Sequence, residues 1–163
     1  MGYFPSITVE SALSVGSALM TSYFWLVRAR RESPCLTVFQ MQDFRALPRR
    51  GDPERKTKRL CFSQVSPGGV LVANNSVLHN SIIRFDCELK LDKQWIKGDF
   101  GWLNDEKPPW NLPPQTTIAL SIACFFEVAE DYAVPEDAEF RVAFQTISGK
   151  KFPHTFHLKN RAA

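Results

Sequence analysis

The side chains best suited to chemistry are histidines, cysteines and neighbouring carboxylates, and their spacing disfavours a catalytic or metal site. His154 and His157 form the closest histidine pair. Residues three apart in a strand point to opposite faces, so these rings cannot bind one metal ion. Asp105-Glu106 and Glu130-Asp131 are adjacent carboxylates typical of solvated turns. The sequence holds no phosphate-binding loop, nucleophile elbow or zinc-helix motif. We predict no catalytic residue, no cofactor and no metal, and expect a protein that is not an enzyme.

The cysteines are widely spaced, with no CxxC pair that would indicate a zinc or redox motif. They are Cys35, Cys61, Cys87 and Cys124. Cys87 and Cys124 alternate with apolar residues, which predicts small buried side chains that could form a disulfide only outside the cytoplasm. The run Asn74-Asn75-Ser76 matches a glycosylation acceptor, which matters only for a lumenal domain.

Alternation of apolar and polar residues predicts strands over most of the chain. The expected strands are 83–91, 118–126, 140–145 and 152–158, with shorter candidates at 35–41, 59–65, 69–73 and 94–97. Turn residues separate them, as in Ser66-Pro67-Gly68-Gly69. His154 shares its strand face with Phe152 and Phe156, so we predict a packed, hydrogen-bonded ring. Seven to eight antiparallel strands in residues 33–160 predict an immunoglobulin-like β-sandwich.

Residues 1–31 form a separate N-terminal segment. The run Ser11 to Val27 is uncharged, and Arg28, Arg30 and Arg31 follow it. A helix of this length spans about 25 Å, close to the short limit for a bilayer core of about 30 Å. Basic residues on one side favour placing that side in the cytoplasm. We expect a single-pass membrane anchor with a cytoplasmic β-domain. A secretory signal and an amphipathic helix are the alternatives.

Two features of this region suggest contacts. Ser14, Ala18 and Ser22 are small residues spaced by four, which predicts a homodimer contact between two such helices. Basic residues are concentrated between Arg45 and Arg59, in a stretch expected to be a loop. Near an anionic leaflet these bases would face lipid, although a simple solvated loop is an equal alternative. The candidate lipid-facing residues are Arg28, Arg30, Arg31, Arg49, Arg50, Arg55, Lys56 and Lys58.

The segment Asp99 to Gln115 is rich in proline and carries Trp102 and Trp110. These tryptophans are candidate contacts for a protein partner or, alternatively, a lid over the core. A net charge of +3 does not indicate nucleic-acid binding. We therefore expect a membrane-anchored, non-catalytic interaction or scaffolding module with an unknown protein partner and contacts to membrane lipids. The alternative is a soluble or exported ligand- or carbohydrate-binding β-sandwich with the helix packed on the domain.

Overall fold

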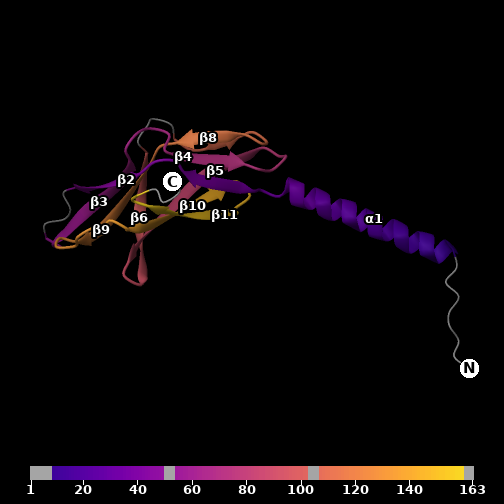
Figure 1. Ribbon diagram of the computed structural model, residues 1–163, viewed down its shortest axis with the longest axis horizontal. Coiled ribbons are helices and arrows are strands. Elements are labelled where there is room, and N and C mark those ends of the chain that lie inside the picture. Colours follow the sequence, from indigo (N-terminus) through magenta and orange to yellow (C-terminus); the bar gives the residue numbers. More distant parts are fainter. Residues whose placement is uncertain (1–8, 50–53, 103–106, 160–163) are drawn as a thin grey trace, which may run out of the picture. The chain divides into compact units, whose positions relative to one another are not determined.

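The computed structural model describes residues 9–49, 54–102 and 107–159, which fall into two compact units, 1–33 and 34–163. The first unit holds helix α1 (Val9–Glu32), and the second holds the strands (Figure 1). The strands are β1 (Leu36–Gln40), β2 (Phe44–Arg49), β3 (Thr57–Gln64), β4 (Val70–Asn74), β5 (Asn80–Leu91), β6 (Gln94–Trp102), β7 (Trp110–Leu112), β8 (Thr117–Leu120), β9 (Ile122–Ala129), β10 (Glu139–Thr146) and β11 (Lys151–His157).

The strands form two sheets, and within each sheet every described pair of neighbouring strands is antiparallel. The smaller sheet has the order β1-β4-β8. The larger has the order β11-β10-β5-β6-β9-β3-β2, and β7 pairs with β5 beside this path. The prediction of a mostly antiparallel, sandwich-like β fold preceded by one helix is confirmed. The described residues form eleven strands, more than the seven to eight expected.

The predicted strand 118–126 is divided at Ser121, where the chain leaves one sheet for the other. Leu120 and Ile122 on either side of Ser121 are both buried, as alternation along one strand predicts, but β8 pairs with β4 whereas β9 pairs with β3 and β6. The Gln64 side-chain oxygen accepts a hydrogen bond from the Ile122 backbone at 3.2 Å. The Ser121 hydroxyl accepts one from the Gly68 backbone at 2.9 Å. These side chains satisfy backbone groups that change partners at the crossing.

Aromatic rings fill the core, as the composition suggests. Phe140 stacks on Phe156 with ring centroids 5.3 Å apart and meets Phe62 at 5.3 Å. Phe44 closes this cluster by edge contacts with Phe140 at 4.9 Å and Phe156 at 5.4 Å. Phe140, Phe156 and Phe62 are fully buried. Burying each such ring stabilises the fold by about 1.5–3 kcal/mol, so this cluster is a main source of stability.

Among the described residues, the basic stretch after residue 44 forms β2, a turn at 54–56 and the start of β3 rather than the expected loop. β2 pairs with β3 from Phe44 opposite Gln64 to Arg49 opposite Arg59. Phe44 is buried, which fixes one face of the strand. β2 lies at the edge of the large sheet, where charged residues and Pro48 are tolerated because one side of the strand has no neighbour. The polar composition of this stretch therefore suggested a loop where the structure has an edge strand.

The single-pass membrane prediction is wrong. No helix in the described part of the chain is both long and apolar enough to cross a membrane. The physical reason is the hydroxyl content of α1, where Ser17, Thr21 and Ser22 interrupt the apolar run. The cytoplasmic placement of the β-domain depended on that span and is withdrawn with it.

The glycosylation motif is an internal structural element. Asn74 is fully buried, and its side-chain amide donates to the backbone carbonyls of Leu78 at 2.9 Å, Leu112 at 3.0 Å and Pro113 at 3.0 Å. Its oxygen accepts from the Ser76 hydroxyl at 2.8 Å. The amide nitrogen that would carry a glycan is therefore occupied inside the folded domain. Asn74 instead ties two loop segments to the end of β4.

Candidate binding cleft between two diverging strands

The most distinctive surface feature is a fork between β5 and β6. The two strands pair over Cys87–Leu91 and Gln94–Gly98. Beyond Gly98, β6 turns to pair with β9, while the start of β5 pairs with β7. β5 also carries a β-bulge at Ile83, where its register with β10 shifts, in the part of the strand that no longer pairs with β6. Bulges bend a strand and interrupt its ladder. Ile83 is accordingly 41% exposed, although strand alternation predicts it to be buried.

A cleft of about 710 Å³ lies at this fork. We call it the fork cleft, and its charged lining residues are Arg84, Asp86, Glu88, Lys97, Asp99 and Lys151. Aromatic rings close it from the core side. Phe85 stacks on Phe100 with centroids 4.5 Å apart and planes 9° apart. The rings fill the gap between the diverging strands, so the cleft has an apolar floor.

Gly98 is the last paired residue before the fork. A Cβ atom at this position would lie 2.4 Å from the Phe126 ring and 2.5 Å from the Phe125 carbonyl oxygen. Real Cβ atoms do not approach other atoms so closely, so only glycine fits without a shift of the neighbouring strand. The close approach of β6 to β9 at the fork therefore depends on Gly98.

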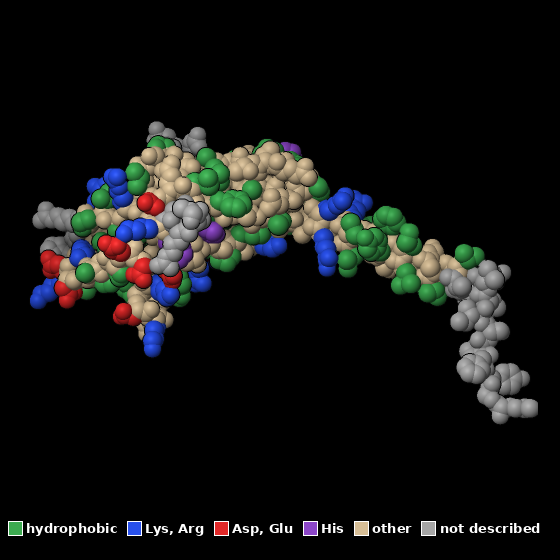
Figure 2. All heavy atoms as spheres, in the orientation of Figure 1, with side chains coloured by type: hydrophobic (Ala, Val, Ile, Leu, Met, Phe, Trp, Pro, Cys, Tyr) green, Lys and Arg blue, Asp and Glu red, His purple; other side chains and the backbone are tan. Residues whose placement is uncertain are grey.

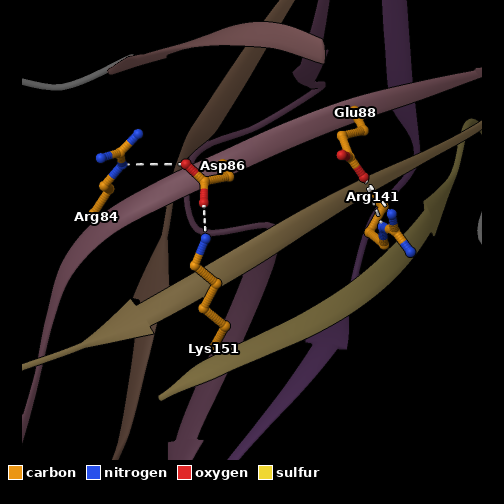
Figure 3. Close-up of polar contacts among 5 residues, drawn as sticks. All are labelled: Arg84, Asp86, Glu88, Arg141 and Lys151. Atoms are coloured by element: carbon orange, nitrogen blue, oxygen red, sulfur yellow. Dashed lines mark hydrogen bonds and ion pairs between the residues drawn. The ribbon is translucent and has the colours of Figure 1, made fainter. Parts of the chain in front are cut away.

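Ion pairs hold the carboxylates of the fork cleft in place (Figure 3). Asp86 accepts from Lys151 Nζ at 2.7 Å and from Arg84 Nε at 3.1 Å. The hydrogen bond from Lys151, together with the positive charges of Lys151 and Arg84, lowers the pKa of Asp86 below its usual value. Lys151 lies on β11, so its side chain crosses β10 to reach β5. Asp86 is therefore ionised and held from two sides.

A second ion pair lies one step along the same face. Nε of Arg141 donates to Glu88 at 3.0 Å, and Nη2 of the same guanidinium contacts the same oxygen (Figure 3). The guanidinium also lies over the Trp95 ring, 4.6 Å from its centroid. Such stacking fixes the arginine while leaving its edge available for hydrogen bonds. Glu88 is thus held in place in the same way as Asp86.

A smaller hollow of about 320 Å³ continues the fork cleft toward β3 and shares Lys97, Gly98 and Asp99 with it. Arg59 pairs with Asp99 at 3.0 Å and lies over the Phe125 ring at 4.7 Å. Lys97 is exposed and, among the described residues, has no ion-pair partner. Figure 2 shows basic and acidic side chains intermixed where β3, β6 and β9 lie in Figure 1. Lys97 therefore offers an exposed ammonium group between two hollows, opposite Glu88 on β5.

The candidate lipid-facing residues do not form one cluster in a single unit. Arg28, Arg30 and Arg31 end α1, whereas the others belong to the β-domain. Arg49 ends β2 and Lys58 lies in β3, with Arg55 and Lys56 in the turn between them. Arg50 lies outside the described residues. Contact of these residues with lipid stays a prediction.

The two candidate partner-binding tryptophans lie on different strands. Trp102 ends β6, and its side chain lies outside the described part of the structure. Trp110 begins β7 and packs against the core, with its ring centroid 4.9 Å from that of Phe85. This is the position that a lid over the core would take. The role of either tryptophan in partner binding stays a prediction.

The histidines and cysteines mostly lie where strand alternation places them. His154 contacts the Phe156 ring at 4.6 Å, and burial, helped by nearby His157, lowers the pKa of His154. No group of residues in the described ranges could hold a metal ion.

Cys61, Cys87 and Cys124 are buried free thiols, and burial raises the pKa of Cys124 well above its usual value. Cys35 is exposed.

Sequence reasoning missed the fork cleft. The alternation in β5 places Asp86 and Glu88 on one solvent-facing side, and that signal was available. Their partners Arg141 and Lys151 are more than 50 residues away, and only strand pairing brings them near. The bulge at Ile83 shows in the sequence only as two adjacent apolar residues, Ile82 and Ile83, and alternation does not tell which of them is buried. The fork was therefore not predictable from the spacing of residues along the chain.

No protein-family model matches the chain, and no curated protein matches it significantly. Among solved structures, the chain is similar to a Bordetella pertussis protein designated ApaA, with 15% identity and a TM-score of 0.40, covering 80% of this chain and 98% of that one. It is also similar to a structural-genomics target, SoR45, with 12% identity and a TM-score of 0.37, covering 80% of this chain and 89% of that one. At these scores neither likeness carries an argument about this protein.

Proposed function

We propose that the β-domain is a non-catalytic binding module whose fork cleft takes a small polyhydroxylated ligand of the carbohydrate class. The observation that carries this proposal is a cleft of about 710 Å³ with fixed charged groups over an aromatic floor. Ligand pockets typically measure about 300–1,000 Å³. Immunoglobulin-like packing of the two sheets belongs to the same proposal, because such sandwiches commonly carry binding surfaces at their edges and loops.

The balance of charge in the cleft favours a neutral polar ligand. Its cations Arg84, Lys97 and Lys151 are matched by the carboxylates Asp86, Glu88 and Asp99. A sugar hydroxyl both donates and accepts, so it fits a surface on which donors and acceptors alternate. A strongly charged ligand would meet a like charge beside each opposite one, which weakens its binding.

The ion pairs also lower the cost of binding. Asp86 is held by Lys151 and Arg84 before a ligand arrives. Ordering one such long side chain on binding costs about 0.5–1.5 kcal/mol. Here the side chains are already ordered in the folded protein, so ligand binding does not carry this cost. Lys97, which has no ion-pair partner in the described part of the chain, is the side chain that a ligand would order. We therefore expect Lys97 to contribute most to affinity.

The proposal is tested by titrating the full chain with a panel of neutral, acidic and amino sugars while recording amide chemical shifts. We expect shifts centred on Asp86, Lys97 and Asp99, and Lys97→Gln should weaken binding about 10-fold, the loss of one charged hydrogen bond. Lys93→Gln, in the exposed turn between β5 and β6, is the matched control. Shifts centred outside the cleft, or none with any sugar at millimolar concentration, would refute the proposal.

A further inference from the structure

Helix α1 carries a broad apolar face that is exposed along the described helix. At 3.6 residues per turn, large apolar side chains cover about half of its circumference. Ser14, Ser17 and Thr21 lie on the other half. The exposed apolar side chains of this face, each 52–68% exposed, are Leu13, Val15, Leu19, Met20, Tyr23, Phe24 and Leu26, whereas Trp25, 64% exposed, lies on the other half. Soluble surfaces rarely expose so large a contiguous apolar patch without a partner.

The spacing within this face is that of a helix that packs against another helix. Leu13, Met20 and Val27 are seven residues apart, and so are Gly16 and Tyr23. These positions alternate by three and four, which is the heptad pattern that forms a helix–helix seam. The exposed area of the seven large side chains is about the 800 Å² per partner that a standard interface buries.

We propose that α1 pairs with α1 of a second copy of this chain, in antiparallel orientation. In the register that best matches side-chain sizes, Leu13 lies opposite Tyr23 and Gly16 lies opposite Met20 of the second copy. A Cβ atom built on Gly16 would have nothing within 4 Å, so there is room for the methionine. The large Met20 side chain thus faces the small Gly16, as close packing requires. A parallel pair would place Gly16 against Gly16 and leave a gap.

Charge favours the same orientation. α1 has its basic residues at the C-terminal end, where Arg30 and Arg31 lie in the last turn and Arg28 pairs with Glu32 at 2.6 Å. A parallel pair would bring two arginine clusters together. An antiparallel pair separates them by the length of the helix and places each near the first turn of the second copy, which contains Glu10. Like charges at close range destabilise a pair, so the parallel arrangement is disfavoured.

The small-residue stripe at Ser14, Ala18 and Ser22 is not part of this interface. On the helix it lies away from the seam that runs through Leu13, Met20 and Val27. The Ser22 hydroxyl donates to the Ala18 carbonyl at 2.8 Å, within its own helix. The proposal therefore replaces the contact suggested by small-residue spacing with one made by the large apolar side chains.

Sedimentation of the full chain across a concentration series tests the association. We expect a dimer, and Met20→Glu should raise its dissociation constant at least about 100-fold, because the seam would bury an unpaired carboxylate. Ser14→Glu is the matched control and should leave the dimer intact. Circular dichroism of both variants checks that α1 and the β-domain remain folded. A wild-type monomer at all concentrations, or a dimer that survives Met20→Glu, would overturn the proposal.

Cross-linking tests the orientation, in a Cys35→Ser background that removes the one exposed thiol. Leu13→Cys and Tyr23→Cys in one chain should give a covalent dimer under mild oxidation by oxidised glutathione, whereas either change alone should not. Ser14→Cys with Ser22→Cys is the control. Efficient dimers from Leu13→Cys alone would show parallel pairing and refute the antiparallel register. A monomer that binds phospholipid vesicles through α1 would show that lipid, not a second copy, covers the apolar face.

Discussion

The two faces of β5 and β10 differ sharply although they share the same backbone. On the inner face, Phe140 and its aromatic neighbours are buried and in contact. On the outer face, Glu88 and Asp86 meet Arg141 and Lys151 around a cleft. Burial of apolar area dominates stability, whereas exposed ion pairs contribute about 0–1 kcal/mol each. The comparison teaches that the inner face holds the fold together, which leaves the outer face free for the binding proposed above.

The largest loss of stability should come from truncating a buried side chain of the inner face, and this tests the comparison most severely. Phe140→Ala should lower the free energy of unfolding by about 3–5 kcal/mol, since the ring lies at the centre of the aromatic cluster. Urea denaturation followed by tryptophan fluorescence measures the loss. Phe39→Ala, at a 48% exposed position, is the control and should cost less than about 1 kcal/mol. Equal losses from the two variants would mean that the cluster is not the source of stability.

Truncating the buried side chain of Asn74 should cause the second-largest loss of stability. Asn74→Ala removes three donated hydrogen bonds and leaves buried carbonyl groups unpaired. We expect a loss of about 2–3 kcal/mol in the same urea experiment. Asn75→Ala is the neighbouring control, because its side-chain amide donates only to the hydroxyl of the half-buried Thr37. If both variants were equally stable, Asn74 would not be the link between its two loop segments.

The free energy of unfolding should depend on pH through the titration of His154. Burial lowers its folded pKa below the usual 6.5, so the unfolded chain binds more protons as the pH falls through that value. Stability should be full above about pH 7 and decline toward pH 5. His154→Gln should flatten this part of the profile, with His79→Gln as the exposed control. A profile unchanged by His154→Gln would place the titrating group elsewhere.

The smallest effect on stability should come from the fork cleft. Asp86→Asn loses ion pairs that are partly exposed, so the free energy of unfolding should change by less than about 1 kcal/mol near neutral pH. The lowered pKa of Asp86 implies that its stabilising effect is full above about pH 4 and is lost as the pH falls through its folded pKa. Wild type and variant should therefore converge in stability once the pH lies below the folded pKa of Asp86. Divergence there would contradict this assignment.

Much of the fold was predictable because it follows from local alternation. The burial of Cys87, Leu89, Val142 and Phe144 repeats every second residue, and that repeat defines β5 and β10. The switch of sheets at Ser121 and the bulge at Ile83 were not predictable, because both are set by which strands become neighbours. α1 was predicted as a helix, but its serines and threonines make it less apolar than a membrane span.

The most direct test of the central claim measures stability and binding on one variant. Lys97→Gln changes only an exposed side chain at the junction of the two hollows. Urea denaturation should give an unfolding midpoint equal to that of the wild type, while the sugar-induced amide shifts at Asp86 and Asp99 are strongly weakened. A variant that loses stability, or that keeps the same sugar-induced shifts, would contradict the division between a stabilising inner face and a binding outer face.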